Sequence, residues 1–324
     1  MGQLPPGERC SLCDVPGVRV GHRTIIRGEG EEAIRTGVTA VVPPGDLYAE
    51  PLPAGAFVLH GHGKAVGLWQ LLHLGTLETP ILLTSTLAVF QAADALVTWT
   101  LARHPKARSV NPVVLECNDG FMSAIELRPV SEGDALAALE AAKGEVEEGC
   151  VGAGTGMIAF ELKSGIGTAS RAVGEWTVGA LALPNMGRRG DFRFLGKRLD
   201  LSGVPRLKRV EQGSVVVVLA TDAPLLPEQL SRLARRGALG LARTGAPASP
   251  GSGDFLVAFS TAYRIPRKAG RIQLQFLPDY KLGELYRAAA EATEEAVLSA
   301  LLSARDMEGR NGPVPALPRS LVAG

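Results

Sequence analysis

The two residues whose types best suit catalysis stand together at Gly213 and Ser214. Ser214 opens an apolar run at 214–225 and follows a basic, glycine-punctuated stretch at 187–210. If the chain is cut between them, Ser214 carries a hydroxyl and a free α-amine, whose reference pKa of about 7.7–8.0 suits a general base. A serine hydroxyl needs such a base to act as a nucleophile. Gly213, without a Cβ, tolerates the strained backbone that attack on its own carbonyl requires. Taken alone, the pair also fits an ordinary Gly–Ser turn before a strand.

Cysteine and histidine pairs are the candidates for a metal site. Cys10 and Cys13 have the spacing of a zinc knuckle, but no second pair lies at a matching distance. His60 and His62 flank Gly61 without a nearby carboxylate or third ligand, which is weak support for a metal. We therefore predict no metal, and we interpret Cys10 and Cys13 as reduced cytosolic thiols.

Two glycine-rich runs invite comparison with phosphate-binding loops. GHGKAVG at 61–67 has the wrong spacing for G-x-G-x-x-G, and GAGTG at 152–156 precedes a strand-like segment instead of opening a clear helix. These glycines are more typical of places where the backbone approaches an active site or a neighbouring layer. We predict no organic cofactor.

The elements that must position these residues follow from the spacing of the apolar side chains. Strands are predicted at 18–23, 37–43, 56–60, 81–89, 112–120, 157–162, 177–183, 214–225 and 254–262. Helices are predicted at 67–75, 91–103, 131–149, 226–245 and 282–304, and the basic run at 187–210 is expected to be an exposed linker. Strands occur both in consecutive runs and in alternation with helices. This pattern favours an α+β or layered α/β/β/α sandwich.

Composition limits the class of protein. The 324 residues suit one large domain or two ordinary ones, and 46% of them are hydrophobic. A formal net charge of +1 points to neither nucleic acid nor an anionic membrane as a partner. No secretory pattern opens the chain, and no apolar stretch reaches the roughly 20 residues that span a bilayer. We expect a soluble, cytoplasmic protein.

Several long blocks resemble one known family. The segments GSVVVVLATDAPLLPEQLSRLARRGALGLARTG at 213–245 and GSGDFLVAFSTA at 251–262 are similar to the C-terminal subunit of the L-aminopeptidase/D-Ala-esterase/amidase family. This DmpA-like family includes the β-peptidyl aminopeptidases. Further matching blocks lie at 14–22, 63–89, 117–120, 151–171 and 184–189, so the resemblance covers nearly the whole chain.

The resemblance implies a four-layer αββα sandwich like that of ornithine acetyltransferase, similar to N-terminal-nucleophile (Ntn) hydrolases. It also implies roles for individual residues. Ser214 matches the nucleophile that follows the self-cleaved bond, and Ser252 and Asp254 match the serine and acidic residue that assist it. Asn185 matches the oxyanion-hole asparagine, whose amide donor would contribute roughly 3–4 kcal/mol.

The resemblance also indicates the substrate pocket. The family places a tyrosine near the substrate where this chain has Phe121, which lacks a hydroxyl. The loop with His60 and His62 is expected to line the pocket without a catalytic role. Lys163 and Arg171, in a matching block, are either structural or in contact with substrate.

The family therefore implies one domain, cut into an α subunit (1–213) and a β subunit (214–324) that stay associated. Ser214 would release an N-terminal amino acid from small peptides, amides or esters through an acyl-enzyme, without a cofactor, in a homo-oligomer of αβ pairs. Two alternatives remain open. Glutamate N-acetyltransferases resemble this fold and also self-cleave, but use threonine. An uncleaved, non-catalytic scaffold is the other, supported only by Phe121 and the histidine loop.

Overall fold

The computed structural model describes residues 2–207 and 213–322. Its strands are β1 (Arg19–Arg27), β2 (Ile34–Val42), β3 (Leu52–Gly61), β4 (Thr76–Leu77), β5 (Ile81–Ser85), β6 (Val113–Cys117), β7 (Ile158–Ala159), β8 (Leu162–Lys163), β9 (Gly167–Val173), β10 (Trp176–Asn185), β11 (Ser214–Thr221), β12 (Gly253–Ser260), β13 (Met307–Gly309) and β14 (Gly312–Val314). Its α-helices are α1 (Leu68–His73), α2 (Val89–Arg103), α3 (Glu132–Glu140), α4 (Pro227–Arg243) and α5 (Gly283–Leu302).

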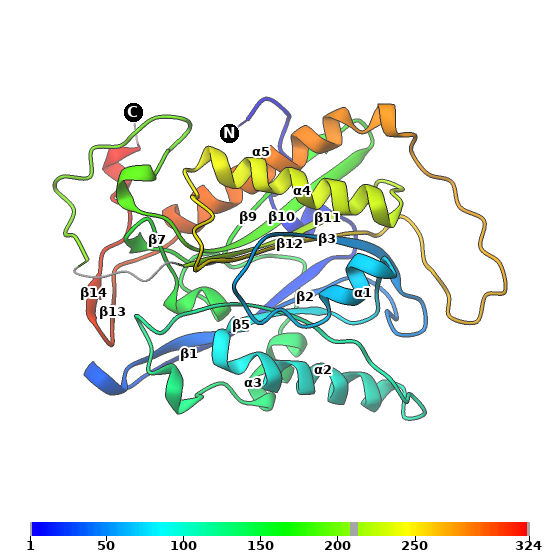
Figure 1. Cartoon of the computed structure of the whole chain (residues 1–324), viewed down its shortest axis with the longest axis horizontal. Helices are drawn as coiled ribbons and strands as arrows, with labels where there is room; N and C mark the ends of the chain where they lie inside the picture. Colours follow the sequence, from blue (N-terminus) through cyan, green and yellow to red (C-terminus); the bar gives the residue numbers. More distant parts are fainter. Residues whose placement is uncertain (1, 208–212, 323–324) are drawn as a thin grey trace.

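Two sheets lie face to face, with a pair of helices on the outer side of each (Figure 1). The six-stranded sheet has the order β4-β3-β12-β11-β10-β9, and helices α4 and α5 cover it. The four-stranded sheet has the order β1-β2-β5-β6, and helices α2 and α3 cover it. This arrangement of the described residues confirms the predicted αββα layering.

Three apolar clusters fill the spaces between these layers. One lies between the six-stranded sheet and helices α4 and α5, a second between the two sheets, and a third beneath α2 and α3. Helix α4 shows how the sequence builds such a contact: Leu230, Leu233 and Leu241 recur along one face and are buried in the first cluster. Burying each leucine contributes about 1.5–3 kcal/mol.

Strand β11 lies inside the six-stranded sheet and is buried on both faces. Val215 and Val217 point into the cluster beneath α4 and α5, whereas Val216 and Val218 point into the cluster between the sheets. Every residue of β11 is buried. This placement explains the continuous apolar run after Ser214, because a strand covered on both sides has no polar alternation.

Several predicted segments differ from the structure. The strand predicted at 157–162 is two short strands, β7 and β8, joined by a turn, and the strand predicted at 81–89 ends at Ser85. The helix expected at 131–149 ends at Glu140, because the following residues turn away and Lys143 bridges to Val20 of β1. The described part of the basic run at 187–210 is not simply exposed: Phe192 and Phe194 are buried in the core beneath α4 and α5. Arg189 is also buried, and donates to the carbonyl of Val204 at 2.7 Å. The packing of this segment is therefore determined by its buried apolar side chains, in spite of its many charged residues.

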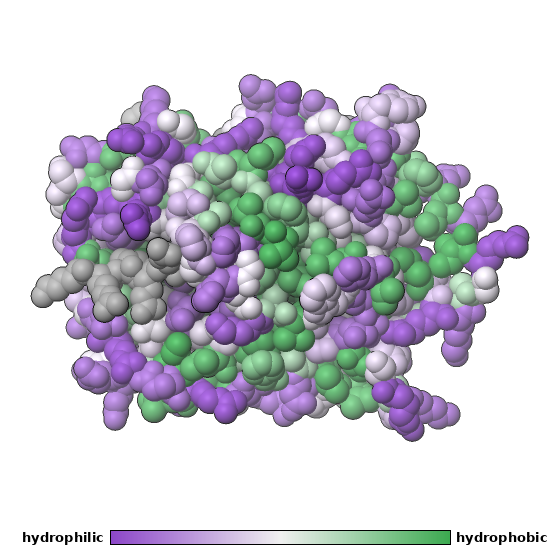
Figure 2. Space-filling model, in the orientation of Figure 1, coloured by the Kyte–Doolittle hydropathy of each residue, from purple (hydrophilic) through white to green (hydrophobic). Residues whose placement is uncertain are grey.

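One segment projects away from the layers. Residues 268–276 extend beyond the end of the sandwich, on the right in Figure 1, and all nine are exposed. Figure 2 shows hydrophobic side chains along this projection. We call residues 268–276 the arm. Among the described residues, no helix is both long and apolar enough to cross a membrane.

Candidate active site

Three strand ends meet at one edge of the six-stranded sheet and carry the candidate residues. Asn185, the last residue of β10, pairs with Ser214, the first residue of β11. On the other side of β11, Asp254 of β12 pairs with Val215. Because β10 runs antiparallel and β12 parallel to β11, these ends lie side by side. The structure thus brings Asn185, Ser214 and Asp254 together with Ser252, and all four are buried.

Gly213 packs so closely against β10 that no side chain fits. A Cβ at this position would lie 1.4 Å from the carbonyl oxygen of Asn185 and 3.0 Å from the Cα of Met186. Both contacts involve backbone atoms, which cannot rotate aside. The sequence argument invoked strained backbone at Gly213, and the structure supplies a steric reason for glycine.

The hydroxyl of Ser214 is held by a backbone amide. Its Oγ accepts a hydrogen bond from the N–H of Gly253 at 3.2 Å. Gly253 lies between Ser252 and Asp254 in the GSGD motif, so the motif contacts the candidate nucleophile through its backbone. No residue type marks this contact, because every residue except proline carries an N–H.

Ser252 and Asp254 form a tight pair beside Ser214. The Ser252 hydroxyl donates to Oδ1 of Asp254 at 2.5 Å. Burial raises the pKa of the Asp254 carboxyl, while the bond from Ser252 and the nearby charge of His60 act in the opposite direction. Among the described residues, the second oxygen of Asp254 is buried without a hydrogen-bond partner. It is therefore available to a cationic group at this edge.

The Asn185 side chain is fixed at both ends. Its amide nitrogen donates to the carbonyl of Asn118 at 2.8 Å, and its oxygen accepts from the N–H of Ile158 at 3.0 Å. An amide nitrogen carries two hydrogens, so one remains for another acceptor. Asn118 and Ile158 were not singled out from the sequence, although Asn118 belongs to CNDG, the matching block at 117–120.

The histidine loop supports the GSGD turn. The Nδ1 atom of His60 lies 2.7 Å from the carbonyl oxygen of Ser252, and the backbone N–H of His62 donates to the same oxygen at 3.1 Å. Phe121 packs against a small apolar cluster that includes Ile158. Through Ile158 this cluster adjoins Asn185.

A buried carboxylate that sequence reasoning missed also lies nearby. Glu116, near the end of β6, accepts a hydrogen bond from the backbone N–H of Lys64 at 3.0 Å. A Cβ at Gly63 would lie 3.0 Å from its Oε1 atom, and a Cβ at Gly253 would lie 3.2 Å from the Cα of Gly63. Gly63 therefore packs close to both Glu116 and Gly253, the residue whose N–H bonds Ser214. Its position directly before Cys117 in the CNDG block was the available signal.

Lys163 is fully buried. Its ammonium group donates to the carbonyls of Met157 at 2.9 Å and Ser164 at 2.5 Å, and burial lowers its pKa to about 8. Lys163 therefore holds the backbone turn next to Ile158. Of the two readings left open for this residue, the structure favours the structural one.

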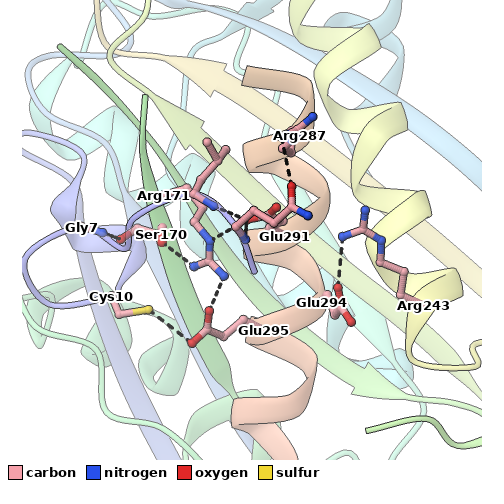
Figure 3. Close-up of polar contacts among 11 residues, drawn as sticks. Gly7, Cys10, Ser170, Arg171, Arg243, Arg287, Glu291, Glu294 and Glu295 are labelled. Carbon is pink, nitrogen blue, oxygen red and sulfur yellow. Dashed lines mark hydrogen bonds and ion pairs between the residues drawn. The ribbon is translucent and has the colours of Figure 1, made fainter. Parts of the chain in front are cut away.

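Arg171 is buried on the far side of the six-stranded sheet, against α5 (Figure 3). Its Nε lies 3.1 Å from Oε2 of Glu291, and its Nη2 contacts Glu295. Glu291 also accepts from the backbone N–H groups of Gln3 and Leu4, at 3.0 Å each. Arg171 therefore joins β9, α5 and the N-terminal segment, which again favours the structural reading.

The described residues contain no group of three or more His, Cys, Asp or Glu side chains arranged to hold a metal ion. The four cysteines are free thiols, with Cys117 and Cys150 buried. Cys10 and Cys13 are half-buried, and burial raises the pKa of the Cys13 thiol to about 11. A protonated thiol is a poor metal ligand.

Comparison with known proteins identifies the family to which the chain is similar. The model of peptidase family S58 matches residues 10–314. The β-peptidyl aminopeptidase BapA of Sphingosinicella microcystinivorans is 38% identical over 335 residues, covering 95% of this chain and 85% of the relative. The PH0078 protein of Pyrococcus horikoshii OT3 is 46% identical, with a TM-score of 0.95 over 99% of this chain and 95% of that one. The L-aminopeptidase D-Ala-esterase/amidase of Ochrobactrum anthropi, described as a prototype serine aminopeptidase with a variant Ntn hydrolase fold, is 34% identical, with a TM-score of 0.90 over 99% and 94%.

The layered fold and the buried serine at a strand end define a serine aminopeptidase with an Ntn-type fold. The chain belongs to peptidase family S58. It is a hydrolase with aminopeptidase and amidase function, which confirms the family and the enzyme class predicted from the sequence.

Proposed function

We propose that the chain cuts its own backbone between Gly213 and Ser214 and then uses Ser214 to release N-terminal residues from small substrates. The observation that carries this proposal is the position of Ser214. It opens a fully buried strand, its hydroxyl is held by the N–H of Gly253, and the Asn185 amide lies opposite.

Self-cleavage needs only groups of this chain and one water molecule. The Ser214 Oγ attacks the carbonyl carbon of Gly213, the C–N bond breaks, and the nitrogen keeps its own hydrogen and takes the hydroxyl proton to become the new α-amine. The resulting ester is hydrolysed by water, which leaves a carboxylate on Gly213 and restores the Ser214 hydroxyl. The tight packing of Gly213 against the backbone of Asn185 and Met186 supports this step, because it fixes the scissile peptide at the strand end that carries Asn185.

Turnover of substrate would repeat the same attack. The α-amine of Ser214 accepts the hydroxyl proton, Oγ attacks the substrate carbonyl, and the remaining N–H of Asn185 stabilises the oxyanion. The leaving amine takes the proton, and water then hydrolyses the acyl-enzyme. Asp254, held by Ser252, offers its unpartnered oxygen to the ammonium form of the α-amine.

Glu116 is our candidate for recognising the substrate's free amine. An aminopeptidase must bind a cationic N-terminus near its nucleophile, and Glu116 is a buried carboxylate close to Gly63 and Gly253. The similarity to BapA supports β-peptides as one substrate class. Phe121 and the loop of His60 and His62 would line the remainder of the pocket.

The two products, residues 1–213 and 214–324, would stay together. Strands β11 and β12 lie between β10 and β3 of the first segment, so separation would break ladders on both sides. We further propose that αβ pairs assemble into a homo-oligomer and that the protein acts in the cytoplasm. Its free cysteines suit a reducing compartment.

Intact mass analysis of the purified wild type beside Ser214→Ala tests the proposal. We expect wild-type fragments of about 22 and 12 kDa, from proportional chain length, with serine at the new N-terminus, and an uncut Ser214→Ala chain. Ser231→Ala, which changes an α4 serine outside the site, should cleave normally. An uncut wild type, folded at neutral pH, would refute self-processing.

A further inference from the structure

The arm carries a row of apolar side chains that the described residues cover only in part. Ile272, Leu274 and Phe276 are 38%, 37% and 51% exposed and alternate with Gln273 and Gln275. In an extended segment this alternation places the three apolar side chains on one side. Free apolar side chains in a row mark a contact surface.

The arm's backbone is equally unpartnered. Its roots are fixed, since Arg267 donates to the carbonyl of Ala49 at 3.0 Å and Leu277 to that of Pro224 at 3.0 Å. Between them, residues 270–276 form no hydrogen bond with any described residue. Ordering a backbone residue costs roughly 1–2 kcal/mol, so an unpaired extended segment is expected to acquire its partner by association. Exposed N–H and C=O groups beside apolar side chains are a template for another chain.

The same side of the molecule offers a matching surface. Trp69 and Leu74 of the α1 region are 76% and 70% exposed, and Leu72 is 41% exposed. Leu72 and Leu74 line a cavity of about 440 Å³, whose opposite wall includes Glu228 of α4. We call this cavity and Trp69 the α1 surface.

This surface lies close to the arm's own root. Gln229, the residue after Glu228, donates to the carbonyl of Leu277 at 2.8 Å. The arm carries Lys268 and Arg271, which complement the charge of Glu228. With an arm and a receptor on one side, two copies can exchange arms about a two-fold axis, each arm meeting the partner's α1 surface.

We propose that the arm docks the side bearing Ile272, Leu274 and Phe276 onto the α1 surface of a second copy of this chain. This contact deepens the homo-oligomer proposed above. It does not depend on self-cleavage, because neither the arm nor α1 contains a residue of the active site. Size measurements therefore test it separately from the mass analysis of the cut.

Two neighbouring substitutions on opposite sides of the arm form a matched pair. Leu274→Glu and Gln275→Glu each add one charge to an exposed position, so neither should disturb folding, which far-UV circular dichroism checks. We expect sedimentation velocity to show wild type and Gln275→Glu as oligomers. Leu274→Glu should dissociate at least about tenfold more readily, as expected for losing one buried leucine at an interface. Leu74→Glu on the receptor should have the same effect.

A wild type that sediments as a single αβ unit, or equal behaviour of Leu274→Glu and Gln275→Glu, would overturn the proposal. A photo-crosslinker identifies the receptor directly. With p-benzoylphenylalanine replacing Phe276, in a mixture of ¹⁵N-labelled and unlabelled chains, cross-links should join different chains and map to the peptide containing α1. Cross-links confined to one chain, or mapped elsewhere, would refute the α1 surface as the receptor.

Discussion

Asn185, the oxyanion donor that we propose, is held rigidly by its neighbours. Its oxygen accepts from Ile158 and one of its hydrogens is donated to Asn118, so the amide plane is fixed. The remaining hydrogen can meet a developing oxyanion without rearrangement. Donors that are already oriented stabilise a transition state more effectively than donors that must first turn.

Replacing Asn185 with alanine should therefore slow the chemical step. For the mature enzyme acting on an amino-acid p-nitroanilide, we expect kcat of Asn185→Ala to fall about 10²–10³-fold, with a small change in KM. Asn311→Ala, which removes an exposed amide that bonds the Phe121 carbonyl, is the control. A kcat within threefold of wild type would show that Asn185 is not the oxyanion donor.

At the scale of elements, Asp119 ties the end of β5 to the turn after β6. Ser85, the last residue of β5, donates to Oδ1 of Asp119 at 2.6 Å. The carbonyl of the neighbouring Asn118 orients Asn185, so the hydrogen bond between Ser85 and Asp119 helps to hold the candidate site in place. Complete burial raises the pKa of Asp119 to about 6.

The raised pKa predicts a pH-dependent stability. In an unfolded chain the pKa of an aspartate is about 4. Between pH 4 and about pH 6, Asp119 therefore keeps its proton in the folded state and has lost it in the unfolded state. The stability contribution is thus full below pH 4 and is lost as pH rises through 6. Asparagine does not titrate, so Asp119→Asn should gain about 2–3 kcal/mol relative to its parent between pH 4 and pH 7.

Urea unfolding in the uncut Ser214→Ala background measures this difference without the complication of two fragments. Ser85→Ala serves as a companion variant. Removing its bond to the ionised form should raise the pKa further and extend the sensitive range above pH 6. A difference between Asp119→Asn and its parent that is constant from pH 4 to pH 7 would contradict the assignment.

At the scale of the whole molecule, Arg171 joins the N-terminal segment, β9 and α5 through Glu291 and Glu295 (Figure 3). Arg171 is fully buried and Glu291 is 4% exposed. Breaking such a network is destabilising mainly because it leaves a buried carboxylate unpaired. An unpaired buried charge costs far more free energy than the intact ion pair does.

We expect Arg171→Met to destabilise the uncut Ser214→Ala protein by about 3–5 kcal/mol, read from its urea midpoint. Arg243→Met breaks the ion pair between Arg243 of α4, which is 47% exposed, and Glu294 of α5, and should cost less than about 1 kcal/mol. Equal costs for the two substitutions would mean that burial of the Arg171 network does not govern its contribution.

The sequence predicted most of what depends on apolar spacing and less of what depends on strand order. The run after Ser214 correctly indicated a strand buried on both faces. The meeting of Asn185 with Ser252 and Asp254 follows from the order β12-β11-β10, which spacing alone does not give, and only the resemblance anticipated it. The catalytic roles of these residues stay predictions.

Backbone contributions were beyond reach of the sequence. The N–H groups of Gly253 and Ile158 and the carbonyl of Asn118 set the geometry of the site, yet no residue type marks them. The prediction of an exposed linker at 187–210 is wrong for its described part, because Phe192 and Phe194 enter the core although many arginines surround them in the sequence. The charged residues of a segment indicate which parts face solvent, and they do not show which apolar side chains attach the segment to the core.

Strands β11 and β12 occupy the middle of the six-stranded sheet, with strands from the first segment on both sides. A separate piece could take this central position only if both neighbouring strands were unpaired, so we expect the sheet to form while the chain is continuous. The proposed cut can then occur only in a finished fold. A misfolded precursor would thus remain uncut. It would lack the free α-amine of Ser214, which it needs in order to act on other proteins or peptides.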